Sequence, residues 1–310
     1  MFWRFINIEW LKDERGSAIV VIALAMIVLL SFMAFVVDAG LLYLVRVRLV
    51  NGVDAAALAG VQALPEDPQK AESLAWEFAH RNGVPDTHLA VSVSEDKREI
   101  MVEASQGVDL NFARIFGLSK AKVGAKSRAR VGVVTGIRGV VPLGVEKQAF
   151  EYGERYILKY GSGEPEWPHS GNFGCLALGG RGAANYRRNL VEGYQDMLHV
   201  GDEVETEPGN MVGPTSGIEE RIAKCNHTPK CTYDNFVLGC PRLVYVPIID
   251  SLDVHGRSKV RIVGFAAFFL EGVEGHGGHS SVIGRFIKAT ADGEIGEGED
   301  FGLRSYKLVE

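Results

Sequence analysis

The chain has 310 residues, of which 46% are hydrophobic and 23% charged, and its formal net charge is −6. This composition is ordinary for folded protein, and the length allows two compact domains beside a membrane segment. Lysine and arginine are scattered along the chain, whereas phosphate binding needs a concentrated basic face. The composition therefore argues against a nucleic-acid partner.

An uncharged apolar stretch lies close to the N-terminus. Residues 17–37 are mainly Ile, Val, Leu, Ala, Met and Phe, and ~21 such residues suffice to cross about 30 Å of hydrocarbon. A cleaved signal peptide is the alternative, because residues 37–39 loosely resemble a small-residue cleavage site, but the stretch exceeds the usual length of about 7–15 residues. We predict an uncleaved transmembrane helix in membrane lipid, preceded by a cytoplasmic segment at residues 1–16.

The orientation of this span rests on the cysteines. Basic residues flank both ends in similar numbers, so the charge rule does not decide. All the cysteines lie in the C-terminal part, at Cys175, Cys225, Cys231 and Cys240. An even number there fits an oxidising compartment. We predict a single-pass cell-membrane protein whose C-terminal part is extracytoplasmic.

The helix is predicted to continue through residues 38–64 and to project clear of the membrane, because only Pro65 supplies a stop. Small residues recur there at helical spacing. One row consists of Gly52, Ala56 and Gly60, and the neighbouring row consists of Ala55, Ala59 and Ala63. Such a smooth helix-packing face permits close approach, either to the protein's own domain or to a partner protein. Asp38, directly after the span, is interpreted as a hydrated membrane-interface residue.

The remainder divides into two regions. Residues 65–134 show the patterns of a helix, a β-hairpin, a short helix and a strand, which predict a small α+β module. Residues 135–310 are rich in glycine and short apolar runs, which predict a β-rich domain with two short helices. Within it, residues 261–270 are too short for a second span and are expected to form a buried central strand. The predicted fold class is α+β.

A cap is expected for the second of these short helices. Thr215 and Ser216 precede the acids Glu219 and Glu220. This arrangement is typical of a helix N-terminus.

The stretch "ERGSAIVVIALAMIVLLSFMAFVVDAG", followed by "LLYLVRVRLVNGVDAAALAG", resembles the N-terminal region of TadG-like proteins of the tight-adherence (Tad/Flp) pilus system. Their signature is a hydrophobic span, an aspartate just after it, and a DAAALAGA-like helix. The resemblance implies assembly, anchoring or surface organisation of a pilus, with pilus or secretion-channel proteins as partners. Val50 departs from the glutamine common in the family, and Val21 stands where pilins usually carry the glutamate associated with leader cleavage. The Asp-x-Ser-x-Ser metal motif of some longer members is absent.

The sequence lacks the common catalytic motifs. G-x-S-x-G, the P-loop and H-E-x-x-H do not occur, so we predict no enzyme activity, no cofactor and no metal site. Cys225, His227, Cys231 and Cys240 could hold zinc, but C-x5-C is looser than the usual zinc-ligand spacing. Disulfides are preferred, with two clustered cysteines paired and Cys175 joined to the third, and free buried thiols are the alternative.

The predicted function is that of a membrane-anchored structural or assembly component of a Tad/Flp-type pilus. Two alternatives stay open. One is a filament-forming pilin-like subunit, because a long helix continuing from the span suits fibre packing. The other is a membrane-tethered hydrolase with an unrecognised site. The sequence also leaves open whether the chain forms an oligomer.

Overall fold

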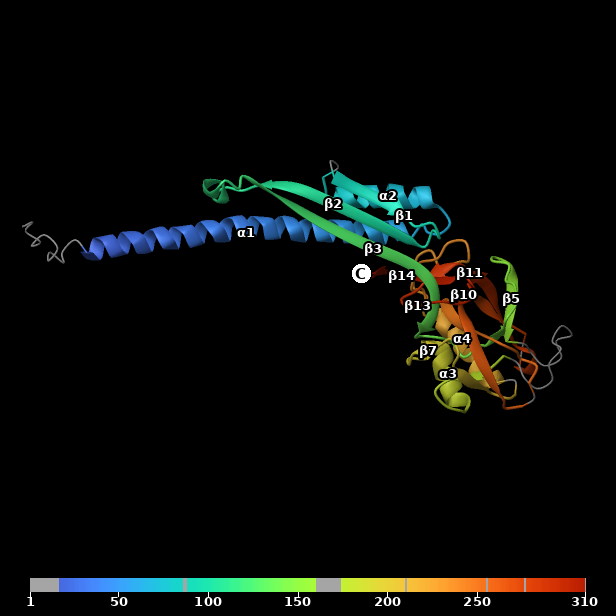
Figure 1. The fold of residues 1–310 in the computed structure, drawn as a ribbon. Coiled ribbons are helices and arrows are strands. Elements are labelled where there is room, and N and C mark those ends of the chain that lie inside the picture. Colours follow the sequence, from blue (N-terminus) through green and yellow to red (C-terminus); the bar gives the residue numbers. More distant parts are fainter. Residues whose placement is uncertain are drawn as a thin grey trace, which may run out of the picture. The chain divides into compact units, whose positions relative to one another are not determined.

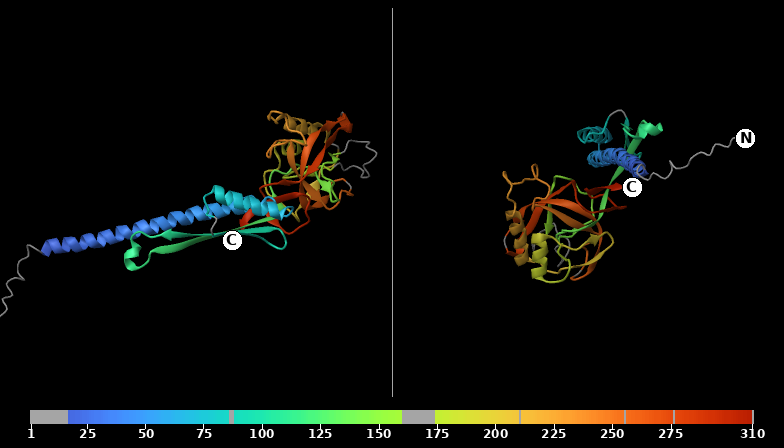
Figure 2. Two further views of the ribbon diagram at one scale, coloured as in Figure 1. Left: turned by 90° about the horizontal axis from the view of Figure 1, so that it is seen from above. Right: turned by 90° about the vertical axis from the view of Figure 1, so that its left-hand side faces the viewer.

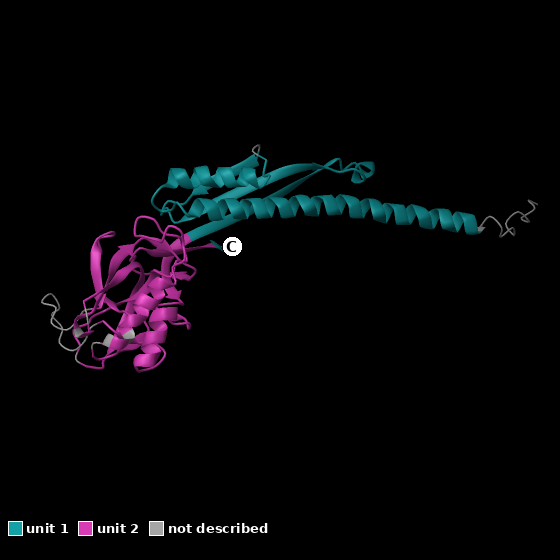
Figure 3. Ribbon diagram, turned by 180° about the vertical axis from the view of Figure 1, so that it is seen from behind, with its two compact units in different colours: residues 1–130, 308–310 teal, residues 131–307 magenta. Residues whose placement is uncertain are grey.

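The computed structural model has an α+β fold, as predicted, and divides into two compact units (Figure 3). Unit 1 comprises residues 1–130 and 308–310, and unit 2 comprises residues 131–307. The structure describes residues 17–85, 88–159, 174–209, 211–254, 256–275 and 277–309. The predicted cytoplasmic segment at residues 1–16 therefore lies outside the described residues.

Unit 1 is built on one long helix, α1 (Ser17–Val61). The side chains of its apolar N-terminal part are exposed, whereas from Val45 onward one side of the helix is buried. Among the described residues α1 is the one helix long and apolar enough to cross a membrane, with a mean hydropathy of 3.1 in its most apolar window. The predicted continuous helix is confirmed, and it ends at Val61, shortly before Pro65.

A second helix, α2 (Pro68–Arg81), packs against the buried half of α1. Its N-terminus is capped by Asp67, whose carboxylate accepts a hydrogen bond from Lys70 N at 2.9 Å, and Pro68 suits the first helical turn. The small residues Ala71, Ala75 and Ala79 form its buried stripe. Three alanines at helical spacing let the two helices approach closely.

The predicted hairpin is confirmed as β1 (Leu89–Val93) and β2 (Glu99–Asp109), and β3 (Lys120–Ile137) pairs antiparallel with β2. Ile100, Val102 and Ala104 alternate inward from β2. β1 pairs with β2 only as far as Ala104, whereas β2 and β3 continue together to Asp109 and Lys120. Beyond β1 they form a two-stranded ribbon alongside α1, ending in the short helix η3 (Ala113–Phe116) (Figures 1 and 2).

The second half of α1 thus belongs to the same core as α2 and the strands. Residues 38–64 were expected to continue the helix clear of the membrane, and packing on the protein's own domain was one of two interpretations. In the structure this half of α1 packs against α2 and β2, which need an apolar surface to cover.

Unit 2 contains a sheet of order β4-β9-β10-β11-β5. These strands are β4 (Val145–Glu146), β9 (Leu243–Ile249), β10 (Lys259–Glu274), β11 (Ser281–Ile287) and β5 (Arg155–Lys159). β10 lies at the centre, and Phe265–Leu270 is buried on both faces, so the prediction of a central strand is confirmed. Phe265, Ala267 and Phe269 face one hydrophobic core, and the alternate residues face another.

Shorter strands and two helices complete unit 2. The strands are β6 (Leu176–Ala177), β7 (Leu198–His199), β8 (Glu203–Thr206), β12 (Ala289–Thr290), β13 (Glu294–Gly296) and β14 (Leu303–Val309), which ends in unit 1. The helices are α3 (Ala183–Glu192) and α4 (Val212–Ala223). They pack together at Gly217, where an added Cβ would lie 3.2 Å from Val191 Cγ2.

The predicted cap of α4 was wrong. The helix begins at Val212, one turn earlier than expected, and no side chain caps it. Thr215 and Ser216 lie inside the helix, where their hydroxyls donate to the carbonyls of Met211 and Gly213 at 2.7 and 2.8 Å. Serine and threonine satisfy their hydroxyls in this way within helices, so their presence alone does not mark a start.

Candidate functional site

The small-residue face of α1 packs inside unit 1. Its buried members are Gly52, Ala56, Gly60 and Ala59, and its half-buried members are Ala55 and Ala63. The side of α1 that carries these small residues therefore packs against α2 and β2.

Close contacts require glycine at two positions on this face. A Cβ at Gly60 would lie 2.5 Å from Ile100 Cδ1 and 2.8 Å from the carbonyl oxygen of Ala71, and one at Gly52 would overlap Val84. Neither position has room for a side chain. Of the two interpretations that the sequence left open, packing on the protein's own domain accounts for both glycines.

Asp38 joins α1 to the tip of the β2–β3 ribbon. Its Oδ1 accepts a hydrogen bond from Asn111 N at 2.9 Å, and its Oδ2 accepts from Phe112 N at 3.0 Å and Ala113 N at 2.7 Å. The residue is only 5% exposed. The expectation that Asp38 is simply hydrated was therefore wrong, because the backbone of the tip covers its carboxylate.

These hydrogen bonds also change the acidity of Asp38. The N–H of Ala113, followed by those of Asn111 and Phe112, lowers the pKa of the carboxyl below 3.8, although burial opposes the shift. The backbone that covers the carboxylate is a single turn that contains Asn111, Phe112 and Ala113. Three N–H donors on one carboxylate stabilise its charged form, so Asp38 holds the tip as an anion.

The tip exposes an apolar cluster, defined here as Phe112, Ile115, Phe116 and Leu118. Ile115 and Phe116 are 82% and 81% exposed, and Leu118 is 61% exposed. Gly117 closes the tip with a φ of 85°, a conformation that favours glycine. Exposed basic residues adjoin the cluster at Arg114, Lys120 and Lys122. Because Asp38 follows the apolar span directly, its hydrogen bonds place the tip beside the end of the span.

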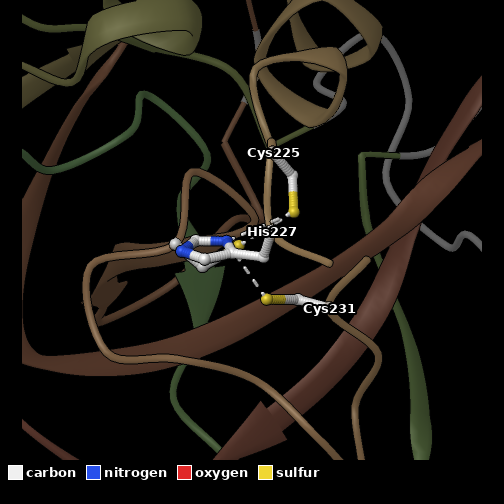
Figure 4. A group of neighbouring side chains, drawn as sticks. Cys225, His227 and Cys231 are labelled. Atoms are coloured by element: carbon white, nitrogen blue, oxygen red, sulfur yellow. Dashed lines mark hydrogen bonds between the residues drawn. The ribbon is translucent and has the colours of Figure 1, made fainter. Parts of the chain in front are cut away.

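A second site lies in unit 2, where the loop between α4 and β9 brings Cys225, His227, Cys231 and Cys240 together. Figure 4 shows the first three of these side chains. Cys225 Sγ is 3.6 Å from His227 Nδ1, Cys231 Sγ is 3.4 Å from the same nitrogen, and Cys240 Sγ is 3.6 Å from Cys225 Sγ. The three cysteines are almost completely buried. The sequence analysis singled out these four residues but did not predict that their side chains lie together.

Backbone donors surround the sulfur atoms of this cluster. The N–H groups of Cys231 and His227 donate to Cys225 Sγ, and the N–H of Arg242 donates to Cys240 Sγ. The Cys231 N–H, together with His227, lowers the pKa of the Cys225 thiol to about 6, whereas burial raises the pKa of the Cys240 thiol to about 12 despite its donor. Negative charge is therefore favoured on Cys225.

Cys175 is separate from the cluster. It belongs to the core on the opposite face of β10, where Tyr186 Oη donates to its Sγ at 3.2 Å. Burial raises the pKa of its thiol to about 11, so it is held in the neutral form. All four cysteines are free thiols in the structure, and the structure does not bring Cys175 to the other three.

Comparison with known proteins identifies the N-terminal region. Residues 16–63 match the family model described as putative Flp pilus-assembly TadE/G-like. This confirms the resemblance to TadG-like proteins, and the matched residues coincide with α1 and its small-residue face. The searches of curated proteins and of solved structures found no match.

Proposed function

We propose that the chain is a membrane-anchored structural component of a Tad/Flp-type pilus assembly apparatus. The observation that carries this proposal is the family match over residues 16–63. It falls on α1, the one helix among the described residues that is long and apolar enough to cross a membrane. The match ends where α1 ends, so the family signature consists of the span and the helix face that holds unit 1 together.

Anchoring follows from the division of α1 into two halves. The large apolar side chains of the first half are exposed. At a rise of 1.5 Å per residue, ~21 residues of helix cross about 30 Å of hydrocarbon. The second half is covered by α2 and β2. The helix can therefore sit in lipid at one end and in a folded domain at the other. We place the folded part of unit 1, after the span, and unit 2 in the extracytoplasmic space.

The role proposed for units 1 and 2 is structural and requires no catalytic step. The partners would be pilus or secretion-channel proteins. The pilin-like alternative would use the exposed apolar half of α1 for packing between subunits. We favour the anchor, because Val21 stands where pilins usually carry the glutamate associated with leader cleavage.

Piliation of the native host tests this function. We expect a strain lacking the gene to lose surface pili and a plasmid copy to restore them. A copy in which a cleavable signal peptide replaces residues 17–37 would release both units from the membrane, and we expect it to be exported without restoring pili. Unchanged piliation in the deletion strain would refute the pilus assignment. Full restoration by the released form would refute the anchor.

A further inference from the structure

The cysteine cluster of unit 2 supports an inference beyond pilus assembly. We propose that Cys225, His227, Cys231 and Cys240 form a structural site for a thiophilic divalent metal ion, with zinc as the preferred ion. Their four ligand atoms lie within 4.8 Å of one another. Three sulfur ligands and one imidazole nitrogen are a ligand set that zinc prefers.

The distances between these atoms agree with tetrahedral coordination. With zinc at about 2.3 Å from sulfur and about 2.0 Å from nitrogen, tetrahedral edges are about 3.8 Å between sulfurs and about 3.5 Å between sulfur and nitrogen. The observed separations are 3.6 Å between Cys240 and Cys225, and 3.6 and 3.4 Å from the two sulfurs to His227 Nδ1. A disulfide would bring two sulfurs to about 2.05 Å.

The number of ligands also favours a metal over disulfides. A disulfide between two of the clustered cysteines would leave the third thiol unpaired, and Cys175 cannot complete a second pair across β10. A metal ion uses all three thiolates and His227 at once. Because four protein ligands leave no open position, the site would be structural rather than catalytic.

The surrounding loop shows what such a site would stabilise. The loop from Lys224 to Arg242 contains no helix or strand, apart from one bridge between Thr232 and Asn235. Connections longer than about 12–15 residues without secondary structure are uncommon in compact domains. A metal ion bound by residues at both ends and in the middle of this loop would hold the loop against the sheet beside β9.

Arg242 supplies a counter-charge next to the proposed site. Zinc with three thiolates and one neutral imidazole carries a net charge of −1. The Arg242 guanidinium donates to the carbonyl oxygen of Cys231 at 2.7 Å and lies over the Phe269 ring at 4.9 Å. Together with the N–H donors to sulfur, it forms the outer layer that usually orients metal ligands.

Metal analysis of the detergent-solubilised full chain, purified through a tag without histidine, tests this proposal. We expect about one zinc ion per chain, and we expect Cys240→Ser to reduce that content about tenfold or more. Cys175→Ser is the matched control, because it removes a buried cysteine from the other face of β10, and it should retain the zinc. His227→Cys should also retain zinc, since it replaces one ligand by another.

A second measurement uses the unsubstituted chain, so its result does not depend on whether a variant folds. The unsubstituted chain is stripped with a chelator under reducing conditions and titrated with Co²⁺ alone, which should produce thiolate charge-transfer bands and the absorption of tetrahedral cobalt. A chain that binds neither ion, or that shows a disulfide between clustered cysteines by mass spectrometry of alkylated peptides, would overturn the proposal. Equal zinc content in folded Cys240→Ser protein would do the same.

An independent observation concerns the apolar cluster of the ribbon tip, and it rests on the proposed membrane anchoring. We infer that Ile115, Phe116 and Leu118 insert into the headgroup region of the bilayer beside the span. They are among the most exposed apolar side chains outside the apolar half of α1. Asp38 holds the tip at the first residue after the span.

The chemistry of the tip suits this position. Phenylalanine and leucine bind the boundary between headgroups and acyl chains, and adjacent basic residues attract anionic lipid. Arg114, Lys120 and Lys122 are exposed beside the cluster, although Lys120 also lies 3.6 Å from Asp109. The inferred occupant of this surface is therefore the same bilayer that holds α1, enriched in anionic lipid.

Fluorescence in nanodiscs containing phosphatidylglycerol tests this inference. Ile115→Cys is labelled with an environment-sensitive dye, and Lys97→Cys, in the turn between β1 and β2, serves as the matched control. The unsubstituted chain measures labelling of native cysteines. We expect a blue shift at residue 115 and none at residue 97. Incorporation without a shift at residue 115 would contradict the inference alone, whereas failure to incorporate would contradict the anchor.

Discussion

At the scale of single residues, Asp38 fastens the tip of the β2–β3 ribbon to α1. Its partners are three backbone N–H groups more than 70 residues further along the chain. The carboxylate is almost fully covered, and these donors stabilise its charged form. One side chain therefore joins the helix to a distant turn.

Replacing Asp38 tests its role in holding the tip. Asp38→Asn keeps the size of the side chain but removes the charge, so we expect the charge-assisted hydrogen bonds to weaken. Amide hydrogen exchange at Asn111, Phe112 and Ala113 should accelerate. Asp54→Asn, on the same helix, is the control and should leave these amides protected. Unchanged exchange in Asp38→Asn would show that the ribbon holds its tip without the carboxylate.

The tip should also respond to acid. The folded-state pKa of Asp38 lies below 3.8, so its stabilisation is fully present above that value and is lost as the pH falls through the folded-state pKa. We expect the Ala113 amide resonance to stay constant from about pH 7 to about pH 5 and to shift at lower pH. A titration of that resonance at or above pH 5 would contradict the assignment.

The cysteines show a limit of what could be predicted from the sequence. Their even number favoured disulfides, and the spacing between Cys225 and Cys231 argued against zinc. Pairing requires thiols on the same side of a sheet, and β10 separates Cys175 from the others. The concentration of three cysteines and His227 within residues 225–240 was the available signal. Spacing rules for short metal-binding turns do not apply to a long loop.

At the scale of secondary-structure elements, the apolar pattern predicted most of the long segments. Uninterrupted apolar runs indicated α1 and β10, helical spacing indicated α2, and alternation indicated the β1–β2 hairpin. The short strands β7, β8, β12 and β13 were missed, because their few residues carry little pattern and pairing with distant strands determines them. The glycine at position 284 similarly obscured β11, where a Cβ would overlap Phe268 and the backbone of Phe269.

The contact between α1 and its neighbours gives an element-scale prediction. Gly60→Ala places a methyl group against Ile100 and the Ala71 carbonyl, so we expect it to destabilise unit 1 by about 1–3 kcal/mol. Gly40→Ala meets no atom within 4 Å and should be neutral or stabilising by up to about 1 kcal/mol. Hydrogen exchange of the α2 amides reports the difference. Equal protection in the two variants would mean that α2 does not depend on close approach at Gly60.

At the scale of the whole molecule, the family match lies entirely within unit 1. The match covers residues 16–63, and these residues form the span and the core helix of unit 1. Unit 2 has its own sheet, its own hydrophobic cores and the cysteine cluster. We propose that α1 is the membrane anchor and that the surfaces of both units contact the pilus apparatus.

Protease accessibility in spheroplasts tests this account most directly. The full chain carries a C-terminal epitope, and protease is added outside the intact cytoplasmic membrane while a cytoplasmic protein is followed as a control. We predict that the chain stays in the membrane fraction with residues 1–16 attached, and that the protease removes the epitope and unit 2. A C-terminal epitope protected until the cytoplasmic membrane is dissolved would contradict the account.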